Sequence, residues 1–448
     1  MLPSLRVCRR GIAAARHFGK SKFAHRNFMS ASFRCTEDWN KRLSSPILQK
    51  VKVGDLFIEL DARLNDTGVA TAADIDIFAN AIRDDEHLDE LDDLLHRFRL
   101  GTGSENTLPS THHAVVRAYL DAGETSELLR ILDDRLNYGV FLDDYSNLLL
   151  MDHFVKQEDF ASAAKIACMR MLQEDFSHPL VNYVSLFVCH KYLQSPAGWE
   201  VESSEPEVDD GEEVRVRVTF LRNPFFDDHF DLRDPNALIG KTFHLITMNM
   251  DDDLGKNYHA LGLCLHKKWE AAEKFITAAL KQGTKFHSSA IEVIDKFVGS
   301  LPEEEQKSLE SLKKAVTSAR DSAVEKDLLA ETADKVKTLV LSEEPKIIKE
   351  QRQAFSAWED QRERVLKDEL EELKKKKRLI EVDKMKQELK EEEEQIFFFD
   401  NEDKMDITIE NKRVRYPKKW VGKKKNKREI GAEYVPPEIT VQKPGSRR

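Results

Sequence analysis

The feature that most constrains the fold is an internal repeat with a period near 35 residues. Tyr119 and Phe154 are 35 residues apart, and the same offset relates four further pairs that are mainly apolar. These pairs are Leu129 and Ala164, Leu132 and Ala167, Leu136 and Met171, and Phe141 and Phe176. Self-similarity at a period of roughly 20 to 50 residues is typical of repeat proteins, in which each repeat is one supersecondary unit.

Each repeat is predicted to be two helices joined by a short turn. Gly123-Glu124 and Glu158-Asp159 occupy equivalent positions, where the chain would turn. Within 160–172 the apolar residues recur at steps of three and four, as one face of a helix requires. They are Phe160, Ala163, Ala164, Ala167 and Met171. Because one hairpin cannot bury its own apolar face, the hairpins are expected to stack into an all-α solenoid.

The stretch from Tyr138 to Asp152, YGVFLDDYSNLLLMD, and the hairpin period resemble pentatricopeptide (PPR) repeats, although TPR repeats have a similar period. With its continuation from Gln173 to Phe176, the stretch resembles the PPR-type family numbered twenty-seven in the small-subunit series of animal mitochondrial ribosomes. The close resemblance covers about residues 70–190, is weaker from 235 to 300, and fades in the C-terminal third. It implies a helical protein that docks on folded RNA among other small-subunit proteins in the mitochondrial matrix.

In PPR proteins that recognise RNA sequence, each repeat binds one base through side chains at fixed positions, one of them near the start of the first helix. Asn147 and His112 fall near that position in the two clearest repeats, and only Asn is a type that such proteins often use. The partner positions fall near Leu142 and Ser177, and a Leu side chain cannot hydrogen-bond a base edge. The resemblance makes Asn147 a candidate RNA-binding residue. The alternative is a helix-start or turn role, which Asn favours anyway.

The N-terminal segment is predicted to be a mitochondrial transit peptide. The first 36 residues contain eight Lys or Arg and no acidic residue, and arginines interrupt any continuous apolar stretch of a secretory signal. Arg16-His17-Phe18 and Arg26-Asn27-Phe28 resemble processing sites, so the mature chain is expected to begin near Met29 to Thr36. The alternative is a basic arm that binds nucleic acid.

Composition divides the chain into six predicted segments. They are the transit peptide (1–34), PPR-like repeats (35–198), an acidic linker (199–218), degenerate helical repeats (219–330), a long charged helix (331–398) and a basic extended tail (399–448). The linker has almost no large apolar residue, so it cannot offset its ordering entropy and is expected to be disordered. The second repeat region regains helical spacing of its apolar residues, for example from Leu261 to Leu280.

The predicted long helix has a narrow apolar stripe. Leu366, Leu373 and Ile380 are seven residues apart, and charged residues crowd between them. A full coiled coil would need a more continuous apolar seam. One hypothesis is a strut that contacts neighbouring ribosomal proteins or RNA. The other is a helix exposed to water, which opposite charges three and four residues apart stabilise without a partner.

The C-terminal tail has the clearest nucleic-acid signal. Residues 411–448 contain thirteen Lys or Arg against three acidic residues, whereas the whole chain has a net charge of −11. The candidate RNA-binding residues are Lys412, Arg413, Arg415, Tyr416, Lys418, Lys419, Trp420, Lys423, Lys424, Lys425, Lys427 and Arg428. Basic side chains gain affinity by releasing counterions from phosphates, and aromatic ones stack on unpaired bases. The alternatives are a solvated charge run and a localisation signal.

The sequence contains no complete signature of an enzyme, a metal site or a membrane span. Gly240-Lys241-Thr242 resembles the end of a phosphate-binding loop, but Pro235 stands where that motif needs Gly. His112-His113 has no cysteine near it, and Asp251-Asp252-Asp253 lacks the spacing of a calcium loop. The five cysteines form no C-x-x-C pair and are expected to be buried thiols, and no apolar run reaches the roughly 18–20 residues that span a bilayer. We therefore expect no catalytic residue, cofactor, metal or small-molecule substrate.

The predicted function is that of a structural, RNA-binding component of the mitochondrial small ribosomal subunit. The expected partners are mitochondrial rRNA, with mRNA or tRNA as alternatives, and other small-subunit proteins. Two alternatives remain: a free PPR-type factor that stabilises or activates mitochondrial transcripts, and a TPR-like adaptor that binds only proteins.

Overall fold

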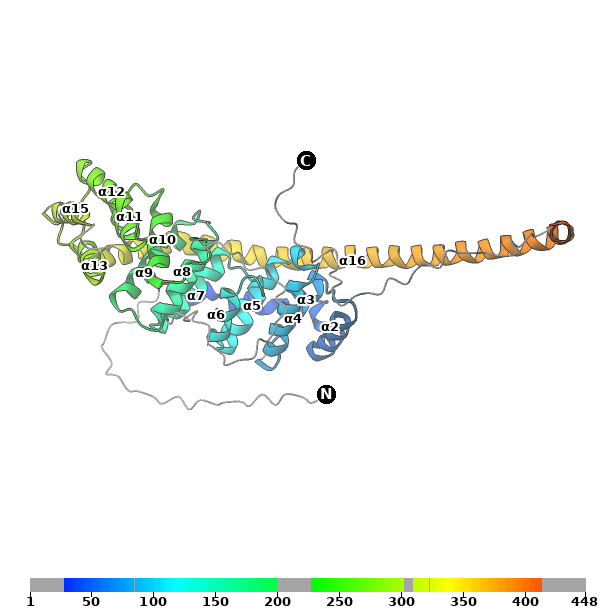
Figure 1. The fold of residues 1–448 in the computed structure, drawn as a ribbon. Helices are drawn as coiled ribbons and strands as arrows, with labels where there is room; N and C mark the ends of the chain where they lie inside the picture. The colour runs from blue at the N-terminus through cyan, green and yellow to red at the C-terminus, as the bar shows by residue number, and fades with distance from the viewer. Residues whose placement is uncertain (1–27, 84, 200–226, 302–308, 322, 413–448) are drawn as a thin grey trace, which may run out of the picture. The chain divides into compact units, whose positions relative to one another are not determined.

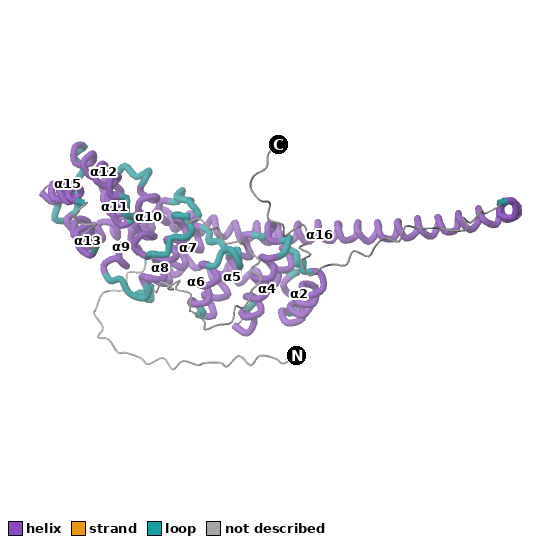
Figure 2. Tube along the Cα trace, viewed as in Figure 1, coloured by secondary structure: helices purple, strands orange, loops and turns teal. Residues whose placement is uncertain are grey.

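The computed structural model describes residues 28–83, 85–199, 227–301, 309–321 and 323–412. These residues form an all-α fold, as predicted, and the described ranges contain no strand (Figure 2). One isolated parallel bridge joins His287 and Val324. The chain comprises two units, residues 1–368 and 369–448.

In the first unit, helices that are neighbours in the chain lie beside one another in space (Figure 1). The short segments are η1 (Ala31–Arg34), α1 (Thr36–Asn40), η2 (Lys41–Ser44), η3 (Leu48–Lys50), η4 (Asp85–His87) and η5 (Ser104–Asn106). The longer helices are α2 (Val53–Thr67), α3 (Ala72–Ala81), α4 (Leu88–Leu100), α5 (Pro109–Ala122), α6 (Thr125–Asp133), α7 (Asp144–Lys156), α8 (Phe160–Leu172), α9 (Pro179–Gln194), α10 (Pro235–Thr247), α11 (Asp253–Leu265), α12 (Trp269–Lys281), α13 (Ser288–Ser300) and α15 (Glu310–Asp321). The last helix, α16 (Leu328–Asn411), begins in the first unit and ends in the second.

From α3 onward the helices pair as hairpins: α3–α4, α5–α6, α7–α8, α9–α10, α11–α12 and α13–α15. We call α3, α5, α7, α9, α11 and α13 the first helices, and their partners the second helices. First helices pack on first helices, as α3 does on α5 and α7 on α9, and second helices pack on second helices, as α8 does on α10. Each apolar face is therefore covered by the next hairpin, as stacked repeats require.

The 35-residue period corresponds to the starts of successive first helices. α5, α7 and α9 begin at Pro109, Asp144 and Pro179, each 35 residues after the last. Proline suits a first helical position because its missing N–H would have no intrahelical partner there. α7 is capped instead by Asp143, whose carboxylate accepts the Ser146 N–H at 2.8 Å. Gly123 ends α5 with φ 84°, at the turn that the sequence predicts.

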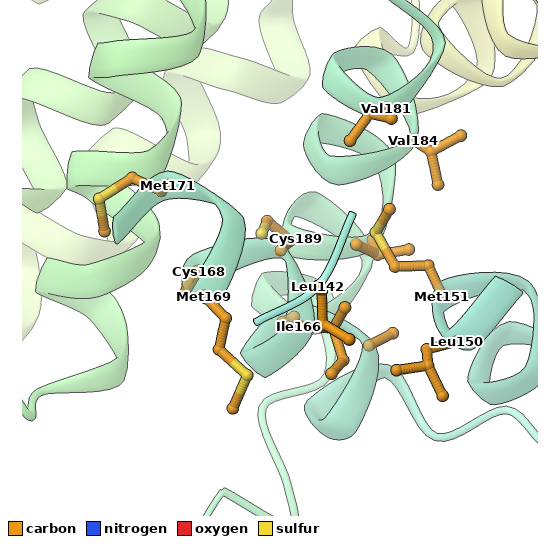
Figure 3. Packing of buried hydrophobic residues seen from close by; sticks show 14 of the residues in the cluster. Leu142, Leu150, Met151, Ile166, Cys168, Met169, Met171, Val181, Val184 and Cys189 are labelled. Carbon is orange, nitrogen blue, oxygen red and sulfur yellow. The ribbon is translucent and has the colours of Figure 1, made fainter. Parts of the chain in front are cut away.

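The core between hairpins depends on small side chains in the second helices. Ala163, Ala164 and Ala167 of α8 are completely buried. Their small side chains let α7 and α9 pack closely against α8. Figure 3 shows larger side chains of the same region, such as Leu150 and Ile166, together with Cys168 and Cys189. The described cysteines, Cys35, Cys168, Cys189 and Cys264, are free and buried, as predicted, and Cys8 lies outside the described residues.

The acidic linker interrupts a hairpin. Its residues from 200 onward lie outside the described ranges, but α9 before it and α10 after it pack against each other within the first unit. Asn182 and Asn257 accordingly both lie near the start of successive first helices, α9 and α11, although they are 75 residues apart. Helix pairing depends on apolar faces rather than on the length of the connection, so the repeats continue past the linker.

The long helix is longer than predicted. α16 begins at Leu328 and ends at Asn411, whereas the sequence analysis expected a helix over 331–398 and an extended tail from 399. The first residues of the predicted tail are therefore helical. Residues 399–411 contain neither Gly nor Pro, and the first proline after them is Pro417.

The part of α16 up to Asp368 packs along the first helices. Thr332 Oγ1 lies 2.9 Å from the hydroxyl of Tyr258 in α11, and a carboxylate oxygen of Glu331 lies 2.9 Å from Nε2 of His287 beside α13. Phe355 contacts the ring of His113 in α5, with centroids 5.4 Å apart.

One polar contact of α16 is a buried ion pair with α3. Arg362 Nε donates to Asp76 Oδ2 at 2.5 Å, and the two side chains are only 4% and 0% exposed. The other oxygen of Asp76 accepts hydrogen bonds from Ser110, Thr111 and Asn80. A buried charge is tolerated only when it is paired and hydrogen-bonded, so this pair specifies one position of α16 on the first helices.

A second buried polar network links three helices. His190 of α9 is completely buried, and its Nδ1 lies 2.9 Å from the hydroxyl of Tyr258, which in turn contacts Thr332 of α16. Burial lowers the pKa of His190 to about 4, and it lowers the pKa of His259 and His266 to about 4 as well. These histidines are neutral in the folded protein near pH 7.

Replacing Arg362 by Ala should lower the free energy of unfolding by about 3–5 kcal/mol, because it leaves Asp76 charged and buried without its partner. The matched control is Arg352→Ala. Arg352 pairs with Asp38 at 2.7 Å with its side chain 56% exposed, and exposed pairs contribute less than about 1 kcal/mol. Urea unfolding of the full chain, followed by circular dichroism, compares the two. Equal losses would contradict the role given to the buried pair.

Acid should destabilise the protein in a window set by the buried histidines. A histidine in the unfolded chain titrates near 6.5, so the unfolded state takes up protons that the folded state excludes as pH falls from about 6.5 towards 4. The melting temperature should fall between about pH 7 and about pH 5, and it should fall less for His190→Gln. His96→Gln in α4 is the control and should behave as wild type. The same fall in all three proteins would show that His190 does not contribute.

Candidate nucleic-acid interface

The structure places the candidate Asn147 in the interior. It lies in the first turn of α7 with its side chain completely buried, and its Nδ2 donates to the carbonyl of Asp143 at 3.2 Å. In this arrangement no base edge can reach the side chain. The position fits the alternative of a helix-start residue that bonds to local backbone.

Two further asparagines, which the sequence did not single out, lie near the start of first helices: Asn182 at the same helix position as Asn147, and Asn257 one position later. Asn182 of α9 donates to the carbonyl of Phe176 at 2.8 Å. Asn257 of α11 donates to the carbonyls of Asp253 and Lys285, at 2.7 and 3.0 Å. The amide of Asn257 therefore joins α11 to the connection before α13. The 35-residue offset from Asn147 would have found Asn182, but the linker shifts Asn257 out of that register.

The chain's own N-terminal segment covers the start of α5 and α7. Phe33 stacks on Tyr145 of α7 with centroids 5.0 Å apart, and the Tyr145 hydroxyl donates to the Phe33 carbonyl at 2.7 Å. Trp39 packs edge-on against His113 of α5, with centroids 4.8 Å apart. Trp358 of α16 lies on the same histidine, with centroids 5.3 Å apart. One side of α5 and α7 is thus occupied by the N-terminal segment and α16 of the same chain.

Packing of this segment bears on the predicted transit peptide. Residues 1–27 lie outside the described ranges, but Phe28, Met29 and Phe33 are 8%, 2% and 1% exposed. The Met29 N–H also donates to Asp152 at 3.2 Å. Cleavage near Thr36 would remove these buried side chains, so the packing favours the early end of the predicted range, at or before Met29. The transit peptide itself stays a prediction.

Of the candidate residues in the basic tail, Lys412 is described. It follows the last turn of α16 and is exposed. The others lie outside the described residues: Arg413, Arg415, Tyr416, Lys418, Lys419, Trp420, Lys423, Lys424, Lys425, Lys427 and Arg428. RNA binding by the tail therefore remains a prediction.

The motifs rejected as chemical sites have structural roles. Gly240-Lys241-Thr242 lies inside α10, where a Cβ on Gly240 would come within 2.6 Å of the His266 backbone nitrogen, so the glycine lets α10 and α11 cross closely. Asp252 caps α11 and accepts a 2.5 Å hydrogen bond from Tyr183 of α9. His113 Nδ1 contacts Ser146 at 3.3 Å. In the described ranges, no cluster of His, Cys, Asp or Glu is arranged to hold a metal ion, and no helix combines the length and apolarity that would let it cross a membrane.

Replacing Phe33 by Ala should lower the free energy of unfolding by about 3–5 kcal/mol, because it removes a buried aromatic side chain that packs on Tyr145. A chain that begins at Phe28 should be nearly as stable as the full chain, whereas one that begins at Thr36 should lose at least as much stability as Phe33→Ala. Urea unfolding of these chains and of the full chain tests this. Equal stability of the chains that begin at Phe28 and Thr36 would show that the segment is not part of the folded core.

Comparison with known families identifies the chain. A family model described as mitochondrial 28S ribosomal protein S27 matches residues 3–388. The match includes every helical hairpin and the part of α16 that packs on the first helices. The family is the one that the resemblance over residues 70–190 predicts. The chain therefore belongs to the mitochondrial 28S ribosomal protein S27 family and is a component of the small subunit of the mitochondrial ribosome.

Proposed function

We propose that the protein is a structural component that docks on ribosomal RNA and on protein neighbours in the mitochondrial matrix, without performing chemistry. The observation that carries this proposal is that other segments of the same chain cover one side of the first helices. Trp39 and Phe355 lie on His113 of α5, and Arg362 is buried against Asp76 of α3. A repeat protein whose base-binding face is covered by its own chain contacts folded RNA through other surfaces.

The tail supplies the RNA contact in this proposal. Its thirteen Lys or Arg release counterions from phosphates, a gain that does not depend on base sequence. Tyr416 and Trp420 lie between the basic residues and would stack on unpaired bases. Such an arm suits rRNA, whose loops present both phosphates and unstacked bases.

The two alternatives are less well supported. A free transcript-binding factor of the PPR type needs accessible base-binding positions, and Asn147 is buried. An adaptor of the TPR type, which binds only proteins, has no use for a basic tail with interleaved aromatic residues. Family membership also favours a ribosomal role over both.

Sedimentation through a sucrose gradient, with magnesium and moderate salt, tests the proposal in lysed mitochondria. The full chain should migrate with small-subunit rRNA and leave that position when the RNA is digested. Deletion of residues 411–448 should release the chain at lower salt, because each lost phosphate contact lowers the affinity for RNA. A full chain at the top of the gradient would overturn the proposal.

A charge-matched pair of variants locates the RNA contact. Lys423, Lys424, Lys425, Lys427 and Arg428 are changed to Gln in one variant. Lys374, Lys375, Lys376, Lys377 and Arg378, all exposed on α16, are changed to Gln in the other. Only the tail variant should dissociate at lower salt. Equal behaviour would show that total charge matters and the tail does not.

A further inference from the structure

A cluster of apolar side chains lies exposed on the second unit. Ile396, Phe397, Phe398 and Phe399 of α16 are 61%, 59%, 49% and 67% exposed. Neither buried cluster of the described residues includes them. Successive residues of an α-helix are about 100° apart around its axis, so four consecutive apolar residues surround the helix. We call Ile396–Phe399 the aromatic collar.

The collar is more than a chance exposure of single side chains. Isolated apolar residues on a surface need no explanation, but a contiguous group marks an interaction site. Phe398 and Phe399 contact each other edge-on, with centroids 5.8 Å apart, and three adjacent phenylalanines are a costly group to leave in water. Phenylalanine is also enriched in the buried centre of protein interfaces. Because the collar surrounds the helix, its partner must cover more than one side and therefore form a pocket.

Charge around the collar argues against RNA as the occupant. Glu391–Glu394 precede it, and Asp400, Glu402, Asp403, Asp406 and Glu410 follow it. Lys404 is the one basic residue from 391 to 411. Phosphates brought against this segment would meet like charge on both sides of the collar, whereas proteins that bind RNA neutralise phosphates with Lys and Arg.

The same charges disfavour a second copy of this chain. In an antiparallel pair centred on Phe398, Glu391–Glu394 of one copy would face residues 402–405 of the other, which carry Glu402 and Asp403 against the single cation Lys404. In a parallel pair, Glu391–Glu394 would face themselves. Like charges placed opposite each other across an interface cost free energy in both arrangements.

We propose that the aromatic collar docks into an apolar pocket of another small-subunit protein, and that Lys or Arg residues border this pocket. The inference rests on the proposed function, since it requires the chain to be built into the subunit among protein neighbours. The phenylalanines supply the buried anchors. The flanking carboxylates of Glu391–Glu394 select a basic rim and exclude both RNA and a second copy.

Photo-crosslinking within the assembled subunit tests the proposal. Phe398 is replaced by p-benzoyl-phenylalanine in the full chain, which is expressed in cells, and small subunits are purified and irradiated. The expected product is a covalent adduct with one small-subunit protein, through a peptide that contains or adjoins Lys or Arg. An adduct with rRNA or with a second copy of the chain would overturn the inference. The same probe at Ile58, which is 67% exposed on α2, is the control. The same adduct from both positions would also overturn it.

A pair of charge variants tests the basic rim. Glu391, Glu392 and Glu393 are changed to Gln in the chain that carries the probe, and the yield of the protein adduct should fall by about fivefold. The matched change is Glu371, Glu372 and Glu381 to Gln, at exposed positions on the same helix, and it should leave the yield unchanged. Equal adduct yields from the two variants would show that the charges beside the collar do not select the partner, and would contradict the proposed basic pocket.

The outcomes separate this inference from the proposed function. A chain that does not sediment with small subunits overturns both. A chain that is incorporated normally, but forms no protein adduct from position 398, overturns only the docking of the collar.

Discussion

The rest of the first unit depends on the packing of α16 along the first helices. A stack of hairpins covers each apolar face with the next hairpin, but it leaves one side of the first helices without a neighbour. The part of α16 from Leu328 to Asp368 covers that side, and the buried pair of Arg362 with Asp76 gives it one specific position. Trp39 packs between α5 and α16, so the N-terminal segment is held by the same contacts. The fold is completed by segments far apart in the sequence.

Covering that side changes what the repeats can do. The asparagines at 147, 182 and 257 hydrogen-bond to backbone carbonyls and help to hold the hairpins, in the region where PPR proteins that recognise RNA sequence bind bases. The protein retains stacked helical hairpins, and one side of its first helices is part of its own core. In the function proposed above, the contacts with ribosomal neighbours lie outside the stack. The basic tail would contact phosphate, and the aromatic collar with its acidic flanks would contact a protein pocket.

Much of the fold could be predicted from the sequence, because hairpin formation is local. The 35-residue offset located the pairs of helices, and Gly123 marks one of the turns. The family prediction was confirmed. The end of α16 was predicted at residue 398, whereas the helix continues to Asn411. Helix propagation needs only the absence of a breaker, and none occurs before Pro417. Of the candidate site residues, Lys412 is exposed and Asn147 is buried, and RNA binding by the tail stays a prediction.

The sequence by itself determined the helical hairpins, the free cysteines, the charge contrast between body and tail, and the family. Each of these depends on composition or on contacts within one repeat, which the chain specifies locally. Only the tertiary structure decided that α9 and α10 pair across the acidic linker, that the N-terminal segment from Phe28 belongs to the core, and that α16 covers the first helices. These are contacts between residues far apart in the sequence, 286 positions in the case of Arg362 and Asp76. The periodicity of the sequence does not predict these contacts, since they depend on which surfaces are left uncovered after the hairpins have stacked.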